Sequence, residues 1–357
     1  MNIDVTLIRQ HLQYIAETLQ KKAYSLRNNT GLLQGKTGIA LFLYLYADYM
    51  NDPAKTLFAD ELTDHIIAHI TEHATLDYST GLTGFGVAIE YLIRKGYIEA
   101  DADEVLEDLD NLVNNYVHDR KYIDILGPGK YLAFRLLNSQ KQKSSMVQRS
   151  RESIAKIMNM PGNTYNTCAE AMATMDMLND LYISEMDNAE IRAYLDYATD
   201  KMETIVYEDM HFGKYPGTFN PLVTAVKLLQ TAENKKDRQY THRALFFLDT
   251  YEAGFRKFLD DGSYGFSSGA FKWAPLYNYV GYKLDNHQYK HLATEWLAIC
   301  LKKIESLANN SIKIPCMDIW NGYAGMGLSL LSFMEGCAAQ DWLSVIPFYL
   351  DKKEIID

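Results

Sequence analysis

The chain has 357 residues, of which 48% are hydrophobic, and it carries a formal net charge of −11 at pH 7. This acidic balance, without a basic stripe, argues against a nucleic-acid partner, because binding to phosphates needs clustered lysine and arginine. No apolar run approaches the roughly 18 residues of a membrane-spanning helix. The four cysteines are too scattered for a disulfide framework, so we expect a soluble cytoplasmic protein with reduced thiols.

A turn of small residues opens a strongly apolar segment seven times along the chain. The clearest copies are residues 35–41, 81–87 and 322–328, each with the pattern Gly-x-x-Gly. Gly81 follows Gly35 by 46 residues, and Gly127, in the Gly-Pro-Gly of the third copy, follows Gly81 by the same interval. A fixed period in this range is typical of a repeat protein, in which neighbouring units bury each other's faces.

The segments after these turns are apolar on nearly every side, which is typical of a helix inside a larger structure. They cover residues 39–47, 168–175, 222–229 and 273–282, besides those after the turns at 81, 127 and 322. Amphipathic helices lie between them, for example at 61–70, where Leu62, Ile66, Ile67 and Ile70 share one side, and at 105–116. We therefore predict an all-α (α/α)7 toroid, with seven apolar inner helices inside an outer ring, as a single domain over residues 1–357.

If all inner helices begin at the same end, their turns surround one mouth of a central cavity, which is the default site. His211 and Asp318 are the candidate catalytic residues at this mouth, as an acid/base pair if the fold brings them together. The candidate binding residues are Tyr215, Ser267, Ser268, Trp320 and Asn321. For each single residue the competing interpretation is ordinary turn capping.

This series of Gly-x-x-Gly turns, each opening an apolar helix, resembles the lanthionine synthetase C-like family. The resemblance covers essentially the whole chain; it is sharp in the first, second and seventh copies and faint in the fourth to sixth. It implies an (α/α)7 toroid. Active members of the family are zinc enzymes that cyclise dehydrated peptides by adding a cysteine thiol to dehydroalanine or dehydrobutyrine, and the metal lowers the pKa of the thiol.

The zinc ligands that the resemblance implies are a Cys before the fifth inner helix and a Cys-His pair before the sixth. Ser267 and Ser268 stand at the place of that pair, and neutral serines are poor zinc ligands. The turn before the fifth helix, residues 211–217, has no Cys, and the family's acid/base His in the fourth turn has no counterpart. We therefore predict no zinc site and no other cofactor.

Two other metal sites stay open as alternatives. One is a relocated site made by His211, Cys168 and Cys316. The other uses His65, His69 and His73, which follow one another at intervals of four residues on a predicted outer helix. The competing interpretations are buried cysteines that pack as small apolar residues and a polar helix face.

Three functions compete. The first is a lanthionine synthetase C-like protein of peptide modification, either a divergent cyclase or a zinc-free relative that binds a peptide or a protein partner at the cavity mouth. The second is a carbohydrate-active α/α toroid, for which Asp318, Asp124 and Glu170 are the acids expected near the cavity. The third is a non-catalytic scaffold. Whether the chain is an enzyme stays open at this point.

Overall fold

The computed structural model describes residues 4–25, 29–71, 74–120, 123, 125–138, 145–158, 168–184, 188–212, 221–254, 263–267, 269–308, 316–334 and 337–349. The described residues are helical, and their β-structure is limited to an isolated bridge between Cys316 and Gly322. The chain divides into two compact units. The first unit comprises Met1–Ala74 and Phe255–Asp357, and the second comprises Thr75–Gly254. The single domain over residues 1–357 stays a prediction.

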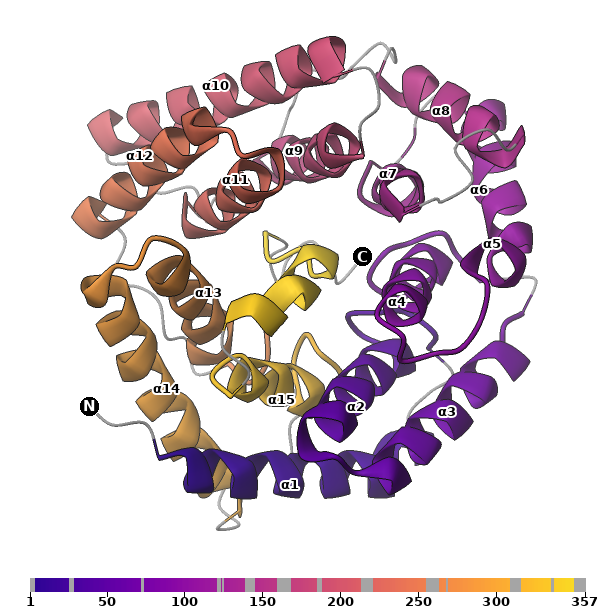
Figure 1. Ribbon diagram of the computed structural model, residues 1–357, viewed down its shortest axis with the longest axis vertical. Coiled ribbons are helices and arrows are strands. Elements are labelled where there is room, and N and C mark those ends of the chain that lie inside the picture. Colours follow the sequence, from indigo (N-terminus) through magenta and orange to yellow (C-terminus); the bar gives the residue numbers. More distant parts are fainter. Residues whose placement is uncertain are drawn as a thin grey trace. The chain divides into compact units, whose positions relative to one another are not determined.

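Three pairs of long helices make up the first unit, as far as its described residues go. They are α2 (Lys36–Met50) with α3 (Pro53–Ala68), α13 (Ala270–Lys283) with α14 (His287–Ala308), and α15 (Tyr323–Leu331) with α1 (Val5–Lys22) (Figure 1). The described residues of this unit also form the 3-10 helices η1 (Ala23–Ser25) and η4 (Cys337–Val345). In α2 every residue from Lys36 to Ala47 is buried, whereas α3 buries only one side.

The described part of the second unit contains four such pairs. In these, α4 (Leu82–Arg94) packs against α6 (Glu107–Asp119), α7 (Lys130–Asn138) against α8 (Ser145–Met158), α9 (Cys168–Ile183) against α10 (Asn188–Phe212), and α11 (Pro221–Lys235) against α12 (Arg238–Gly254). The short α5 (Ala102–Val105) precedes α6, and a π-helical turn, η2 (Ile125–Gly129), opens α7. Pairs of this kind agree with the predicted α/α class. None of the helices described is long and apolar enough to cross a lipid bilayer.

The predicted amphipathic faces are partly wrong. In α3, Leu62 and Ile66 are buried as expected, but Ile67 is 46% exposed, and Ile70 lies beyond the end of the helix and is 36% exposed. In the predicted helix at 105–116, Val113 is buried on α6 as expected, but Leu112, expected on the same side, is 46% exposed; Val117 is buried as well. These positions lie at the edge of the apolar stripe, so a shift of one residue in the helix register decides which of them is covered.

The three clearest turns close in the same way. The first residue of the following helix donates its backbone N–H to the carbonyl seven residues earlier: Lys36 to Asn29 at 2.9 Å, Leu82 to Thr75 at 2.8 Å, and Tyr323 to Cys316 at 2.9 Å. At the last of these, a Cβ on Gly322 would lie 1.7 Å from the Cys316 carbonyl oxygen, so only glycine fits. The third copy differs, because η2 opens its helix.

Candidate functional site

Two turns of the first unit lie against each other: residues 263–267, which come before α13, and residues 316–322, which open α15. The N–H of Phe266 donates to the carbonyl of Ile319 at 3.1 Å, and the N–H of Ser267 donates to the carbonyl of Trp320 at 2.8 Å. Gly265, at φ +93°, allows the approach, since a Cβ there would lie 2.7 Å from the nitrogen of Gly322. The fold therefore places the backbone of Ser267 beside that of Trp320, and both residues were predicted to bind at the same mouth.

A third helix-opening turn joins this pair. The N–H of Trp320 donates to the carbonyl of Leu33 at 3.0 Å, in the turn that precedes α2. The Ile319 side chain packs against Gly38, where a Cβ would lie 2.7 Å from it. Within the first unit, three of the predicted turns thus meet at residues 319 and 320.

Two buried polar groups in these turns have no hydrogen-bond partner among the described residues: the Ser267 hydroxyl and the Trp320 indole nitrogen. Both residues are 1% exposed. Leaving a buried donor unpaired costs about 1–3 kcal/mol. The hydroxyl can donate or accept, whereas the indole N–H only donates. Each group is therefore able to donate a hydrogen bond to an acceptor.

Lys272, on the first turn of α13, was not predicted as a site residue. Its side chain is buried, and Nζ lies 5.1 Å from the centre of the Trp273 ring and 6.0 Å from that of Trp320. A lysine three residues after Gly269, in an otherwise apolar helix, was the available sequence signal. Its ammonium adds positive charge beside Trp320, which also favours an acceptor as ligand.

Asp318 is half-buried in the same turn, and the N–H of Asn321 donates to its Oδ1 at 2.7 Å. Burial raises the pKa of the Asp318 carboxyl to about 6, against the lowering effect of the Asn321 and Trp320 backbone N–H groups. A carboxyl with such a pKa can exchange a proton near neutral pH. Asp77 accepts the equivalent bond, from Thr80 N–H at 2.6 Å, in the turn before α4. The bond itself is therefore part of the turn structure.

The structure does not test the pairing of Asp318 with His211. His211 lies in the last turn of α10, which ends at Phe212, and its side chain is outside the described residues. Tyr215, Ser268 and Asp124 also lie outside them, as do the side chains of Cys168 and Glu170. Their roles stay predictions.

The described residues do not fit a zinc centre. They hold no group of three or more His, Cys, Asp and Glu side chains that could bind a metal. Cys316 is a free thiol, and desolvation together with the charge of Asp318 raises its pKa, which disfavours the thiolate that zinc needs. Ser267 offers only a neutral oxygen.

The pair His65 and His69 is bound to protein groups instead. His65 Nε2 lies 3.1 Å from Lys36 Nζ, and His69 Nδ1 lies 2.7 Å from the His65 carbonyl oxygen. Desolvation and the Lys36 ammonium lower the pKa of His65. His73 lies outside the described residues.

A buried charge cluster in the second unit was also missed. Lys130 Nζ lies 2.5 Å from Asp180 Oδ2 and 3.1 Å from Asp176 Oδ1, and Lys227 Nζ lies 2.8 Å from Asp176 Oδ1. Burial alone would raise the pKa of Asp176, but the two ammonium groups outweigh it and lower the pKa. The charges of the two ammonium and two carboxylate groups cancel. Their ion pairs connect α7, α9 and α11.

Comparison with known proteins defines the fold class. No protein-family model matches the chain, and neither does a curated protein sequence. Seven chains of solved structures do match, and they place it in the all-α class with the paired helices of an α/α toroid, as predicted. One of them is nisin cyclase, with a TM-score of 0.66 and 13% identity over 96% of this chain and 98% of that chain. The resemblance drawn from the turns is thereby confirmed for the fold.

Proposed function

We propose that the chain is a zinc-free relative of the lanthionine cyclases and binds a peptide at the turns 263–267 and 316–322. One observation carries this proposal. At the position where the resemblance expects a zinc-binding Cys, the Ser267 hydroxyl is buried and has no hydrogen-bond partner among the described residues. The same holds for the indole N–H of Trp320, whose backbone carbonyl accepts the Ser267 N–H. Each of these groups can donate a hydrogen bond to a carbonyl or carboxylate of a peptide.

The fold supports the choice of a peptide, because nisin cyclase matches nearly the whole of both chains. The chemistry of the turns supports a role without metal, because Ser267 is neutral and the raised pKa of Cys316 keeps its thiol protonated. Asp318, with a pKa of about 6, would hold or release a proton at the edge of the bound peptide. We also propose that the protein is located in the cytoplasm.

The test uses a fluorescent peptide that contains dehydrated residues and a free cysteine. Its binding is measured by anisotropy, with and without a metal chelator, and its thiols are counted by alkylation and mass spectrometry. We expect binding that survives chelation and leaves the thiol count unchanged. Loss of thiols that depends on added zinc would contradict the zinc-free role. Absence of binding would contradict the peptide role, and binding of a neutral oligosaccharide instead would favour the carbohydrate alternative.

Replacing Ser267 by alanine should weaken peptide binding, because the hydrogen bond to the peptide is lost. One neutral hydrogen bond is worth about 0.5–1.5 kcal/mol, or roughly a twofold to tenfold change in Kd. Ser329→Ala is the matched control: this hydroxyl, inside α15, is also buried and has no hydrogen-bond partner in the described part of the chain. Both variants remove the same atom, so equal effects on binding would assign Ser267 a purely structural role.

A further inference from the structure

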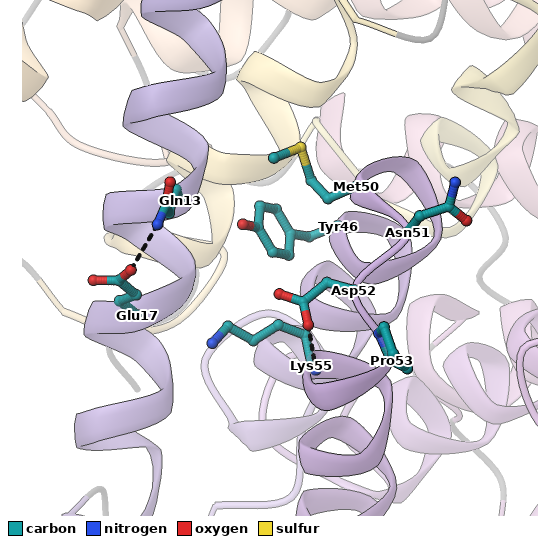
Figure 2. Close-up of a pocket in the computed structure, with 8 residues that line it drawn as sticks. All are labelled: Gln13, Glu17, Tyr46, Met50, Asn51, Asp52, Pro53 and Lys55. Atoms are coloured by element: carbon teal, nitrogen blue, oxygen red, sulfur yellow. Dashed lines mark hydrogen bonds between the residues drawn. The ribbon is translucent and has the colours of Figure 1, made fainter.

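A polar hollow of about 340 Å³ lies between α1, the end of α2 and the start of α3 (Figure 2). Its lining residues are Gln13, Glu17, Tyr46, Met50, Asn51, Asp52, Pro53 and Lys55. All of them belong to the first unit. The hollow is at the C-terminal end of α2, whereas the turn at Gly35 opens the N-terminal end. It is therefore separate from the candidate site described above.

Tyr46 is the central side chain of this hollow. It is 2% exposed, and its hydroxyl makes no hydrogen bond to the residues that the structure describes. Figure 2 shows the ring extending into the hollow with its oxygen toward α1. The Phe42 ring, 5.8 Å away between centres, supports the Tyr46 ring from one turn earlier in α2. This hydroxyl makes no bond to a described residue and lies at the wall of a hollow, so it is available to a ligand.

Glu17 and Asp52 each accept hydrogen bonds from described residues with only one of their two carboxylate oxygens. Glu17 Oε1 accepts from Gln13 Nε2 at 3.0 Å, and Asp52 Oδ1 accepts from the backbone N–H groups that open α3. The second oxygen of each carboxylate makes no bond to a described residue. Both charges act on Tyr46, whose pKa is raised by burial first and then by Asp52 and Glu17. The lining is thus rich in acceptors around one hydroxyl.

The charges around the hollow favour a cation. Glu17 and Asp52 outnumber Lys55, whose ammonium is held by Gln20 Oε1 at 2.6 Å. The C-terminal end of α2 adds the partial negative charge of a helix terminus. The described residues hold no group of three or more His, Cys, Asp and Glu side chains that could bind a metal, and the hollow has only these two carboxylates. The Tyr46 ring and the Met50 thioether instead suit the methylene stem of an organic cation.

We propose that this hollow binds a primary alkylammonium group, of the kind that a lysine side chain presents, with Tyr46, Glu17 and Asp52 as its acceptors. An ammonium group brings three N–H donors, and the hollow offers the Tyr46 hydroxyl and the carboxylates of Glu17 and Asp52 as acceptors. The site holds one side chain, with the stem against Met50. It is independent of the proposed function, because neither the residues nor the probe are shared.

The test titrates the full chain with Nα-acetyl-lysine methylamide and follows binding by calorimetry or NMR. The norleucine analogue, with a similar stem and no charge, is the comparison, and we expect it to bind at least tenfold more weakly, since a charged hydrogen bond is worth about 1.5–3 kcal/mol. Equal binding of the two compounds, or stronger binding of an anionic analogue, would overturn the proposal.

Two variants locate the site. Tyr46→Phe removes only the hydroxyl and should weaken lysine-probe binding roughly threefold to tenfold, and Glu17→Gln should do the same while leaving the buried core intact. Tyr49→Phe is the control, because that hydroxyl faces Arg9, at 3.3 Å from Nη2, and does not line the hollow. Unchanged binding in both Tyr46→Phe and Glu17→Gln would place the ammonium elsewhere and refute the assignment.

Discussion

At the scale of single residues, the Asp318 side chain both accepts a hydrogen bond within its turn and binds a proton at a raised pKa. Its carboxyl accepts the N–H of Asn321, as Asp77 accepts the N–H of Thr80 in another turn. Burial also raises its pKa from 3.8 to about 6. A raised pKa means that the folded chain binds the proton more strongly than the unfolded chain does. Asp318 therefore makes stability fall as the pH rises from about 4 to about 6.

Asp318→Asn should remove this part of the pH dependence and keep the acceptor for Asn321. At about 1.4 kcal/mol per pK unit, the raised pKa of Asp318 lowers the free energy of unfolding by about 3 kcal/mol once the carboxyl is ionised. The variant escapes this loss at pH 7.5, although its weaker hydrogen bond to Asn321 offsets about 1 kcal/mol of the gain. Urea unfolding at pH 4.5 and 7.5 measures the difference. Asp285→Asn is the control, since the hydrogen bond and charge of Lys290 lower the pKa of this exposed carboxyl. A variant that is stabilised equally at both pH values would contradict the assignment.

At the scale of the elements, the backbone rather than the side chains starts the repeated helices. Gly35, Gly81 and Gly322 hold the N-cap positions without a side-chain cap, and the closing bond to a carbonyl seven residues earlier takes over that function. The close approach that this bond requires explains why glycine recurs there. It also explains why the glycines were visible in the sequence.

Gly322→Ala should lower the free energy of unfolding by about 3 kcal/mol or more, because its Cβ would overlap the rigid Cys316 carbonyl. Gly129→Ala serves as the comparison: there a Cβ would meet the flexible Met177 thioether at 2.9 Å, and we expect a loss of about 1 kcal/mol or less. Denaturant midpoints of both variants check this. Similar losses in the two would mean that the closed turn is not the stabilising feature.

At the scale of the whole molecule, the charge cluster joins helices that are far apart in the chain. Asp176 on α9 contacts Lys130 on α7 and Lys227 on α11. Asp176→Asn would leave two buried ammonium groups opposite one carboxylate, so we expect a loss of about 3–5 kcal/mol. The double variant Asp176→Leu with Lys227→Met should recover much of it, as thermal unfolding would show. A double variant as unstable as the sum of its parts would contradict charge balance as the cause.

The sequence was sufficient for the fold class, whereas the roles of the site residues stay predictions. The helix pairs followed from glycine turns and all-round apolar segments, because both signals are local. Ser267 and Trp320 were predicted for one site, and the two turns do contact each other. The charge cluster and the hollow at Tyr46 were missed, because their partners come from different helices and no local pattern marks them. Ile67 was wrongly placed because a helix stripe has ambiguous edges.

The backbone closure of the turns has a consequence for sequence change. In the turn from Cys316 to Tyr323 the closing hydrogen bond joins two main-chain groups and requires one glycine. The side chains in between are therefore not needed for this bond. A residue such as Asn321, whose side chain takes no part in that bond, can be exchanged while the helix still begins at the same place. Turns of this type allow chemistry to be gained, lost or replaced at a fixed position, while the surrounding architecture keeps its shape.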